Sequence, residues 1–268
     1  MAIGLAVLNV VLQIGYPLTG GSNRRVVTIA SVVVFFCASL AHCVSTRSWR
    51  SGLALVMICV GGGLAAESIG WRTGWPFGNY RYGTTLGPKL LGVPMVVPLA
   101  WAMMGWPALL AGRRVGRRFP VVKGISADES TKFRLGCRVQ VVTAVVGSLV
   151  LSSWDLFLDP QMVGAGHWRW LTTPGPWLNG IPLVNTVGWF IVGMLMVFVL
   201  DRAVPNDPTM PGCDTLMWVV LAWVWFSNIV GQLVFFRHPM VALAGGVASS
   251  VVALIVAGKT FRLPRLRP

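Results

Sequence analysis

The chain has 268 residues, of which 55% are hydrophobic and only 11% are charged. Soluble globular domains carry about 25% charged residues, so this composition excludes an ordinary soluble fold. The net charge of +14 does not indicate a nucleic-acid partner, because the basic residues lie between apolar segments, where membrane proteins keep their anchors.

Apolar segments of the length that a bilayer requires follow one another along the chain. A helix rises about 1.5 Å per residue, so it crosses a hydrocarbon core of about 30 Å with roughly 17–25 residues. The sequence predicts an all-α, polytopic transmembrane bundle of about eight helices, forming a single integral membrane domain over residues 1–268. The predicted spans are residues 2–18, 26–44, 52–70, 90–111, 139–158, 181–200, 216–236 and 240–257.

The first segment is interpreted as a span and not as a signal peptide, because it contains Asn9 and Gln13 and lacks a basic start. With eight spans, most of the 22 Lys and Arg residues fall on the side of the two termini. The positive-inside rule then predicts a multi-pass protein of the cytoplasmic membrane with both termini in the cytoplasm. The longest loop, residues 112–138, is basic and is expected to contact anionic lipid.

Metal and cofactor motifs are not found in this sequence. The three histidines are isolated, no glycine-rich phosphate loop follows a predicted strand, and no C-x-x-C spacing occurs. We therefore expect no metal, nucleotide or flavin cofactor and no disulfide framework. The five cysteines are Cys37, Cys43, Cys59, Cys137 and Cys213.

An internal repeat appears when the chain is compared with itself. Residues 80–101 and 168–189 are identical at ten of 22 positions, at a constant offset of 88 and without a gap. We predict a tandem helix-loop-helix repeat over residues 52–112 and 140–200, in which spans three and four form one copy and spans five and six the other. Parallel copies are related by a pseudo-twofold axis along the membrane normal.

The same offset places Glu67 over Asp155, two acids inside apolar segments. An ionised carboxylate in the bilayer costs roughly 2.5–3.5 kcal/mol, so such residues normally face a protein interior or a wet cavity. Asp159 follows Asp155 by four residues and lies on the same helix face if the helix continues. Glu67, Asp155 and Asp159 are therefore the candidate catalytic residues, near one membrane boundary. The alternative for Asp159, which precedes Pro160, is a turn cap.

Aromatic residues gather on the same side of the predicted membrane. They are candidate contacts for an apolar substrate, although each alone also fits an interfacial belt. Arg81 and Arg169 either neutralise the acids or anchor the loops at headgroups. The candidate substrate-binding residues are Trp71, Trp75, Phe77, Tyr80, Tyr82, Trp154, Trp168, Trp170 and Asn185.

The segment ESIGWRTGWPFGNYRYGTTLGPKLLGVPMVVPLAW, residues 67–101, resembles a family of membrane carotenoid biosynthesis proteins. The later pieces DLFLDPQM and GIPLVNTVGW resemble the second half of the same family, which includes the bisanhydrobacterioruberin and γ-carotene hydratases. The resemblance implies an acyclic carotenoid or related polyene lipid as the substrate. It implies the addition of water to the terminal isoprenoid double bond (C-1′,2′), which leaves a tertiary alcohol.

Hydration of such an alkene needs a proton at the less substituted carbon and water at the resulting tertiary cation, and it needs no redox cofactor. A buried carboxylic acid can give the proton, a carboxylate can orient the water, and aromatic faces stabilise the cation. Our hypothesis is that Asp155 or Glu67 donates the proton and the other positions water, with Asp159 as an auxiliary or alternative base.

Three alternatives remain open from the sequence. A proton-initiated cyclase of the lycopene-cyclase type uses the same first step but needs a dry aromatic cage, whereas a hydratase needs a polar pocket. A non-enzymatic carrier or transporter of an isoprenoid lipid also fits parallel repeats and intramembrane acids. An inactive accessory subunit is the third. The polar pocket of a hydratase is expected to be lined by Thr84, Thr85, Thr172, Thr173 and Asn185.

Overall fold

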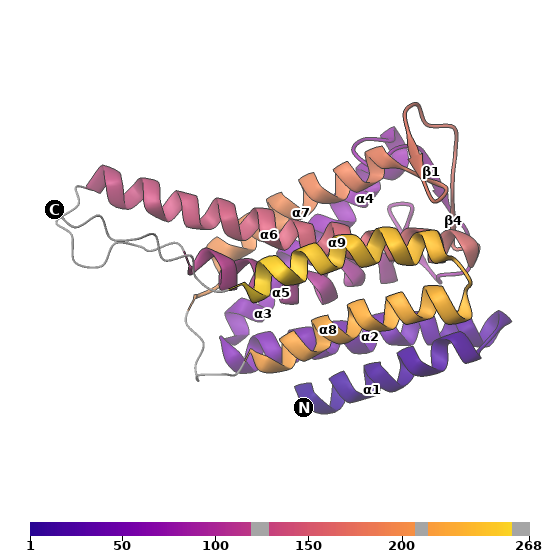
Figure 1. The fold of residues 1–268 in the computed structure, drawn as a ribbon, viewed down its shortest axis with the longest axis horizontal. Helices are drawn as coiled ribbons and strands as arrows, with labels where there is room; N and C mark the ends of the chain where they lie inside the picture. Colours follow the sequence, from indigo (N-terminus) through magenta and orange to yellow (C-terminus); the bar gives the residue numbers. More distant parts are fainter. Residues whose placement is uncertain (119–128, 207–213, 259–268) are drawn as a thin grey trace.

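The computed structural model describes residues 1–118, 129–206 and 214–258, and side chains from residue 136 onward in the second range. Cys213, the centre of the basic loop 112–138 and the basic residues after position 258 lie outside this description. Figure 1 shows a bundle of helices with short strands at one end. The first helix begins and the last one ends at the opposite end of the bundle.

Eight helical rods form the described part of the bundle, which confirms the predicted fold class. Two of them contain π-helical segments, η2 and η3, so α3, η2 and α4 form one continuous rod, as do α8 and η3. The helices are α1 (Ala2–Gly15, followed by the short η1, Tyr16–Leu18), α2 (Gly21–Thr46), α3 (Trp49–Leu55), η2 (Val56–Gly61), α4 (Gly62–Thr73), α5 (Val96–Gly116), α6 (Glu129–Gly164), α7 (Leu183–Ala203), α8 (Thr215–Val230), η3 (Gly231–Phe235) and α9 (Pro239–Ala257).

Among the described residues, six helices are long and apolar enough to cross a membrane, which makes the chain a multi-pass membrane protein. Two further predicted spans are also helical: residues 2–18, a shorter apolar helix, and α5, which is almost entirely buried. The outward faces of the outer helices carry exposed apolar side chains, as a lipid-facing surface requires. Examples are Val7, Leu53, Leu195, Val219 and Leu254.

Two predicted span boundaries are wrong. Residues 90–94 and 181–182 were expected to be helical, but they lie in short hairpins that precede α5 and α7. Gly92 and Gly180 have positive φ angles there, and Pro94 and Pro182 lack the N–H that a helix interior uses. The strands are β1 (Tyr80–Tyr82), β2 (Lys89–Leu90), β3 (Val93–Pro94), β4 (Trp168–Trp170), β5 (Trp177–Leu178) and β6 (Ile181–Pro182).

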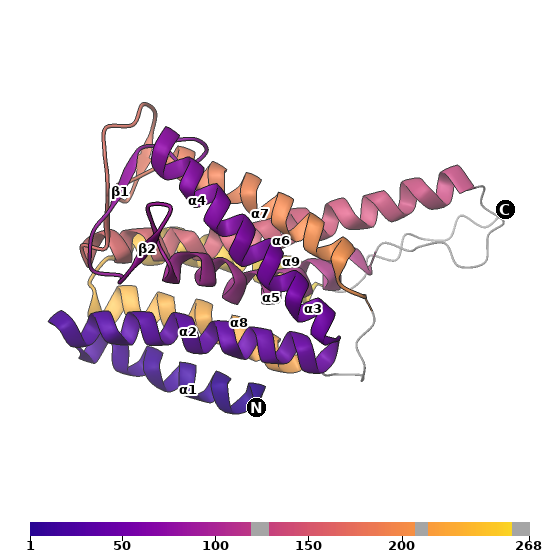
Figure 2. The ribbon, with the colours of Figure 1, turned by 180° about the vertical axis from the view of Figure 1, so that it is seen from behind.

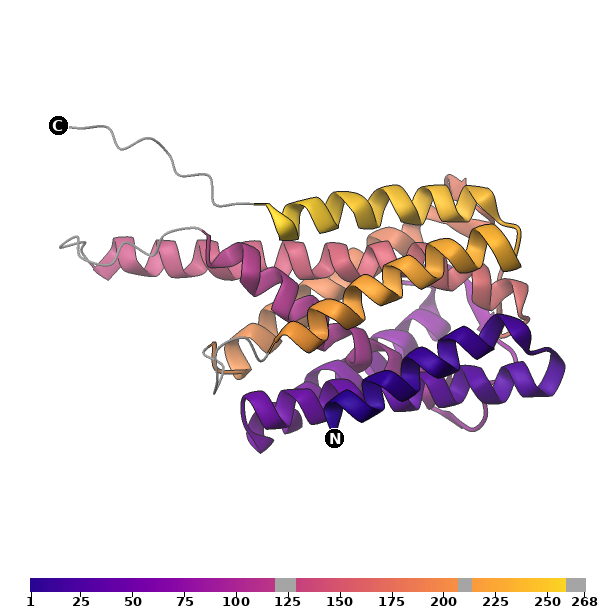
Figure 3. The same ribbon diagram turned by 60° about the horizontal axis from the view of Figure 1, so that its bottom comes forward.

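Helix α5 is the centre of the bundle and packs against α2, α6 and α7. Trp101, Trp106 and Arg113 are among its fully or nearly fully buried side chains. The view from behind in Figure 2 shows the α3–α4 rod running beside α7, in front of α5. Helices α8 and α9 close the other side, and Figure 3 shows α8 lying between α9 and α1.

The two segments of the predicted repeat have the same order of elements: α4, β1, β2, β3, α5 and then α6, β4, β5, β6, α7. Their hairpins have equivalent registers, with Leu90 opposite Val93 in one and Leu178 opposite Ile181 in the other. The turn residues Leu91 and Asn179 both have φ of 52°. The tandem repeat stays a prediction, which this agreement of backbone structure supports.

Three pairs of residues separated by 88 positions contact each other directly. Arg81 pairs with Arg169 in the antiparallel β1–β4 sheet. The rings of Trp101 and Trp189 stack with centroids 3.9 Å apart. Arg113 Nε donates to Asp201 Oδ1 at 2.6 Å. A residue that touches its own equivalent lies close to a twofold axis, so these contacts agree with the predicted pseudo-twofold arrangement.

Breaking the Arg113–Asp201 pair is expected to destabilise the bundle. Asp201→Ala leaves a buried guanidinium without its carboxylate, at a cost of about 3 kcal/mol or more. Thermal or denaturant unfolding in detergent measures the loss. The matched control is Arg202→Ala, which removes an exposed side chain bonded to Gln140 and should change stability by less than about 0.5 kcal/mol. Equal stability of the two variants would contradict the role of this ion pair.

The orientation of the chain in the membrane can be tested with reporter fusions. Arg47, between α2 and α3, Arg50, in the first turn of α3, and Arg113 and Arg114, in the last turn of α5, lie at the end of the bundle opposite the strands. We propose that this end faces the cytoplasm of the cell, because basic residues flank spans on that side. A fluorescent-protein fusion at the C-terminus should fluoresce and a secreted-phosphatase fusion there should be inactive. The reverse pattern would place the strands in the cytoplasm.

Candidate active site

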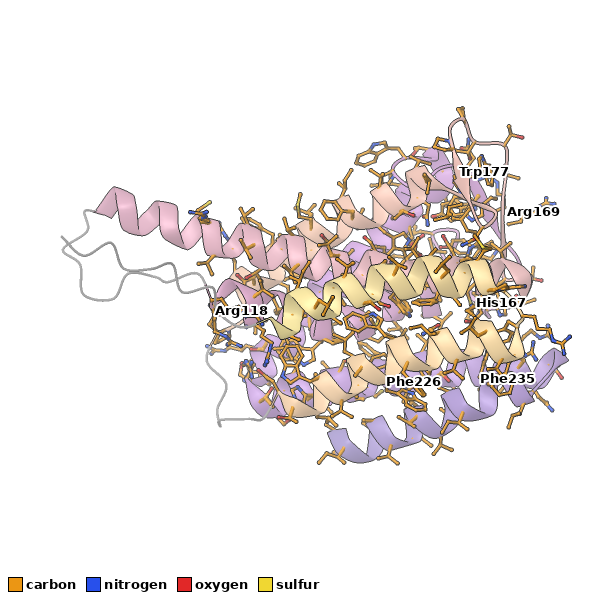
Figure 4. All side chains as sticks on the ribbon, in the orientation of Figure 1. Arg118, His167, Arg169, Trp177, Phe226 and Phe235 are labelled. Atoms are coloured by element: carbon orange, nitrogen blue, oxygen red, sulfur yellow. The ribbon has the colours of Figure 1, made fainter. Side chains whose placement is uncertain are left out.

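The strand end of the bundle is organised by the pairing of β1 with β4. Tyr80 lies opposite Trp170 and Tyr82 opposite Trp168. Because side chains alternate along a strand, Tyr80 and Tyr82 project to one face and Arg81 to the other. Tyr80 is buried and Arg81 is exposed. Arg169, labelled in Figure 4, is likewise exposed on the outer side of this sheet.

Glu67 lies on α4 with 5% of its surface exposed and accepts hydrogen bonds from three side chains. Its Oε2 atom accepts from the hydroxyls of Tyr80 at 2.6 Å and Tyr82 at 2.7 Å. Its Oε1 atom accepts from the indole Nε1 of Trp101 at 3.0 Å. The carboxyl group is thus joined to β1 and α5 by groups that donate to it, which is the environment of an ionised carboxylate.

The phenols of Tyr80 and Tyr82 remain protonated in this setting. Burial raises the pKa of both hydroxyls, and the charge of the neighbouring Glu67 raises it further. A raised pKa keeps the neutral, donating form of a phenol over a wider pH range. The two tyrosines therefore act as hydrogen-bond donors to Glu67 throughout the accessible pH range.

Glycines on the Glu67 face of α4 allow these donors to approach. Gly63 and Gly70 lie one turn before and one turn after Glu67, on the same side of the helix. A Cβ atom at Gly63 would lie 2.8 Å from the ring of Trp101, and one at Gly70 would lie 2.7 Å from Phe77 and 3.0 Å from the Tyr80 hydroxyl. The small residues are required by the packing of the site.

Asp155 and Asp159 lie one turn apart on α6, 1% and 4% exposed, and both accept from the amide of Asn185 on α7. Asn185 Nδ2 donates to Asp155 Oδ2 at 2.8 Å and also to Asp159 Oδ2. Trp168 Nε1 donates to Asp159 Oδ1 at 2.9 Å. Asp155 Oδ1 is buried without a hydrogen-bond partner among the described residues. It faces a small void with room for about one water molecule, lined also by Thr186.

Glu67 and Asp159 face a common cavity. Its polar lining consists of Glu67, Asp159, Asn185 and Thr28, together with the hydroxyls of the two tyrosines. Asp155 does not line it and reaches it only through Asn185. Aromatic rings form most of the remaining wall. They belong to Phe77, Tyr80, Tyr82, Trp101, Trp168, Trp170 and Trp189.

The predicted substrate-binding residues separate into two groups. Six of them line the cavity: Phe77, Tyr80, Tyr82, Trp168, Trp170 and Asn185. The other three do not. Trp71 packs against Gly92 and under the Arg81 guanidinium. Trp75 is 65% exposed, and Trp154 packs edge-on against Trp189 and lines a neighbouring void.

Trp101 and Trp189 are the site residues that the sequence analysis did not select. Their rings are parallel within 13° and form part of the cavity wall. They are the last identical pair of the 22-residue match, and this was the signal that could have found them. Both lie inside helices, where a tryptophan is ordinarily a core residue and not an interfacial anchor.

Arginine does not neutralise the acids of this site. Arg81 donates to the backbone carbonyls of Trp71 and Tyr80 and covers the Trp71 ring. Within the described ranges, the side-chain ion pairs join Arg47 to Asp214 and Arg113 to Asp201, at the other end of the bundle. The Glu67 carboxyl group is therefore satisfied by hydrogen bonds alone in the part of the chain that the structure describes.

Comparison with known proteins identifies the family of the chain. Residues 25–256 match the family described as "Carotenoid biosynthesis protein". The chain belongs to this family. It is 32% identical over 189 residues to the bisanhydrobacterioruberin hydratase of Haloarcula japonica, an alignment that covers 65% of this chain and 55% of that protein. The chain thus spans about half the length of this curated relative. No solved structure matches it.

Family membership confirms the resemblance inferred from residues 67–101, and the matched range includes every acid of the site. Aromatic walls with few polar groups are typical of sites for apolar ligands.

Adding one methyl group at Gly63 is expected to disturb the site. The Cβ of Gly63→Ala would overlap the Trp101 ring and displace the indole that donates to Glu67, at a cost of about 1–3 kcal/mol. Gly61→Ala is the matched control, because a Cβ at Gly61 meets nothing within 4 Å. Unfolding in detergent, followed by tryptophan fluorescence, measures the difference. Identical unfolding of both variants would contradict the close packing of the Trp101 ring against Gly63.

Proposed function

We propose that this chain is a carotenoid hydratase, which adds water to the terminal isoprenoid double bond (C-1′,2′) of an acyclic carotenoid end by acid catalysis. The observation that carries the proposal is that Glu67 and Asp159 face one aromatic-lined cavity from two different helices. The name of the Haloarcula japonica relative supports the same reaction class. The reaction needs no redox cofactor, because no electrons are gained or lost by the substrate as a whole.

The acid is the pair formed by Asp155 and Asp159. Both carboxyl groups are buried, both accept from the Asn185 amide, and no described cation contacts them. Two carboxylates this close in a dry site cannot both be charged, so the pair retains a proton, as paired carboxyl groups do in other acid catalysts. Asp159, which lines the cavity, gives this proton to C-2′. The π electrons form the new C–H bond and leave a positive charge at C-1′.

The aromatic wall stabilises the tertiary cation. An aromatic face attracts a cation by about 0.5–2 kcal/mol, and the stacked rings of Trp101 and Trp189 border the cavity together with Trp168 and Trp170. Such stabilisation acts only once the charge has formed, so it favours the transition state over the bound alkene.

Glu67 is the base that completes the hydration. Its three donors hold it as a carboxylate, and each carboxylate oxygen has two lone pairs, so Oε1 can still accept from a water molecule. The water oxygen forms the C–O bond at C-1′, and its proton passes to Glu67. The proton later returns to the aspartate pair through solvent, which restores the starting state.

A cyclase remains the second candidate because of one observation. None of the four threonines expected in a polar pocket lines the cavity. Thr85 instead bonds to His167 at 2.7 Å, and Thr173 accepts from the backbone N–H of Asn79. The cavity is therefore drier than a hydratase was expected to need, and the same acid could start a ring closure there.

Expression in a host that accumulates lycopene should yield a more polar pigment, heavier by one water. Glu67→Gln and Asp159→Asn should each lower its yield about 10²–10⁴-fold, because each removes one proton transfer. Asp155→Asn should lose less, since Asp155 acts through Asn185. Pigments are measured by chromatography and mass spectrometry. Arg202→Ala, which changes an exposed side chain at the other end of the bundle, is the control for folding and should retain the product.

The products separate the alternatives. A pigment with the mass of lycopene but an altered spectrum would indicate the cyclase. Unchanged pigment in cells that contain the folded protein would favour a carrier or an accessory subunit. Full turnover by Glu67→Gln would remove Glu67 from the mechanism.

A further inference from the structure

A second and larger void adjoins the reaction cavity. Its volume is about 240 Å³, compared with about 60 Å³ for the reaction cavity. It lies among α1, α2, α6 and the α8–η3 rod, away from α4 and α7. Figure 4 labels two of its lining residues, Phe226 and Phe235, on the α8–η3 rod. The catalytic scheme above uses none of the residues that line this void alone.

The two voids share a wall. Thr28 and Val32 on α2, and Leu158 and Met162 on α6, line both of them. These side chains are all that the two linings have in common, and the Met162 side chain is flexible and changes rotamer at low cost. The two voids therefore adjoin along these four side chains, between α2 and α6.

The lining of the larger void suits a long apolar chain. Phe35, Met103, Trp154 and Phe226 contribute apolar and aromatic surface. The polar side chains include Gln13, whose Oε1 is already bonded to Trp223 Nε1 at 2.7 Å, and Ser31. No charged side chain of the described residues is found in the lining. One cation lies at its margin: the Arg24 guanidinium covers the rings of Tyr16 and Phe236, 5.7 and 5.9 Å from their centroids. The lining itself therefore offers apolar packing to a hydrocarbon chain.

We propose that the larger void is the chamber that holds the polyene chain of the carotenoid while its end group occupies the reaction cavity. The inference rests on the proposed function for the identity of the ligand. The reaction cavity is too small for a whole carotenoid, so the rest of the conjugated chain must lie elsewhere, and this chamber adjoins the cavity at the shared wall. Burial of the chain there supplies binding energy far from the reacting bond, since apolar surface is removed from the bilayer and held in one place.

The test fills the chamber without touching the acids. Ser31→Trp, on α2, places a large ring in the chamber. Its control is Val33→Trp, two residues further along, at a side chain that does not line the chamber and is 38% exposed. Ser227→Trp on α8 repeats the test from another helix, with Val219→Trp, 62% exposed, as its control. Size-exclusion chromatography and thermal unfolding in detergent verify that all four variants are folded.

Two measurements are made on protein purified from lycopene-accumulating cells: bound pigment per protein, from its visible absorbance, and hydrated product. The chamber variants should carry about tenfold less pigment than their controls or the wild type, which corresponds to the loss of part of the buried chain. They should still hydrate a short acyclic isoprenoid of two isoprene units, which fits in the reaction cavity.

The outcomes are distinguishable from those of the proposed function. Pigment retained equally by Ser31→Trp and Val33→Trp, and by Ser227→Trp and Val219→Trp, would overturn the chamber, whatever the catalytic activity. A wild-type protein that binds pigment but forms no hydrated product would overturn the hydratase and leave the chamber in place. Phospholipid in place of pigment in the wild-type protein would show that the void is filled by the bilayer, and it would also overturn the proposal.

Discussion

The need to satisfy a buried carboxylate determines the architecture of this end of the molecule. Glu67 lies inside an apolar bundle, where an unbonded charge would cost far more than the helix could compensate. Its three donors come from β1 and from the central helix α5, so α4, β1 and α5 are joined at one point. The pairing of β1 with β4 extends this connection to α6, where the second set of acids lies.

The two segments of the predicted repeat have a similar backbone structure but different side chains at the site. Asp159 and Asn185 correspond, at an offset of 88, to Trp71 and Val97, so one half has a pair of acids bridged by an amide and the other a single acid. Glu67 is bonded by hydroxyls of β1, whereas Asp159 is bonded by an indole of β4. Two acids in unlike environments are what a reaction with both a proton donor and a proton acceptor requires.

Sequence reasoning is most reliable where one physical requirement determines the outcome. The bilayer demands apolar helices, and this prediction of the fold class is confirmed. The cost of buried charge indicated Glu67, Asp155 and Asp159 as site residues, and their catalytic roles stay a prediction. The rotation of a helix about its axis depends on packing instead. The four-residue spacing placed both aspartates on one side of α6, but only the structure shows that Asp159 faces the cavity and Asp155 faces Asn185. The direction of a loop side chain cannot be predicted from the sequence either. Phe77 is buried, whereas Trp75, two residues earlier, is exposed.

Contacts between residues 88 positions apart explain two of the identities between the two segments of the predicted repeat. Trp101 and Trp189 stack on each other, and Arg81 and Arg169 pair across the small sheet, so each residue is the other's environment. A change in one copy would have to be matched in the other. Arg113 and Asp201 are also 88 positions apart and in contact, but they carry opposite charges. Two like charges would repel each other when buried there, whereas opposite charges form a buried ion pair. Residues away from the predicted pseudo-twofold axis, such as Asn185, do not contact the residue 88 positions away. Such residues can therefore differ between the two segments of the predicted repeat.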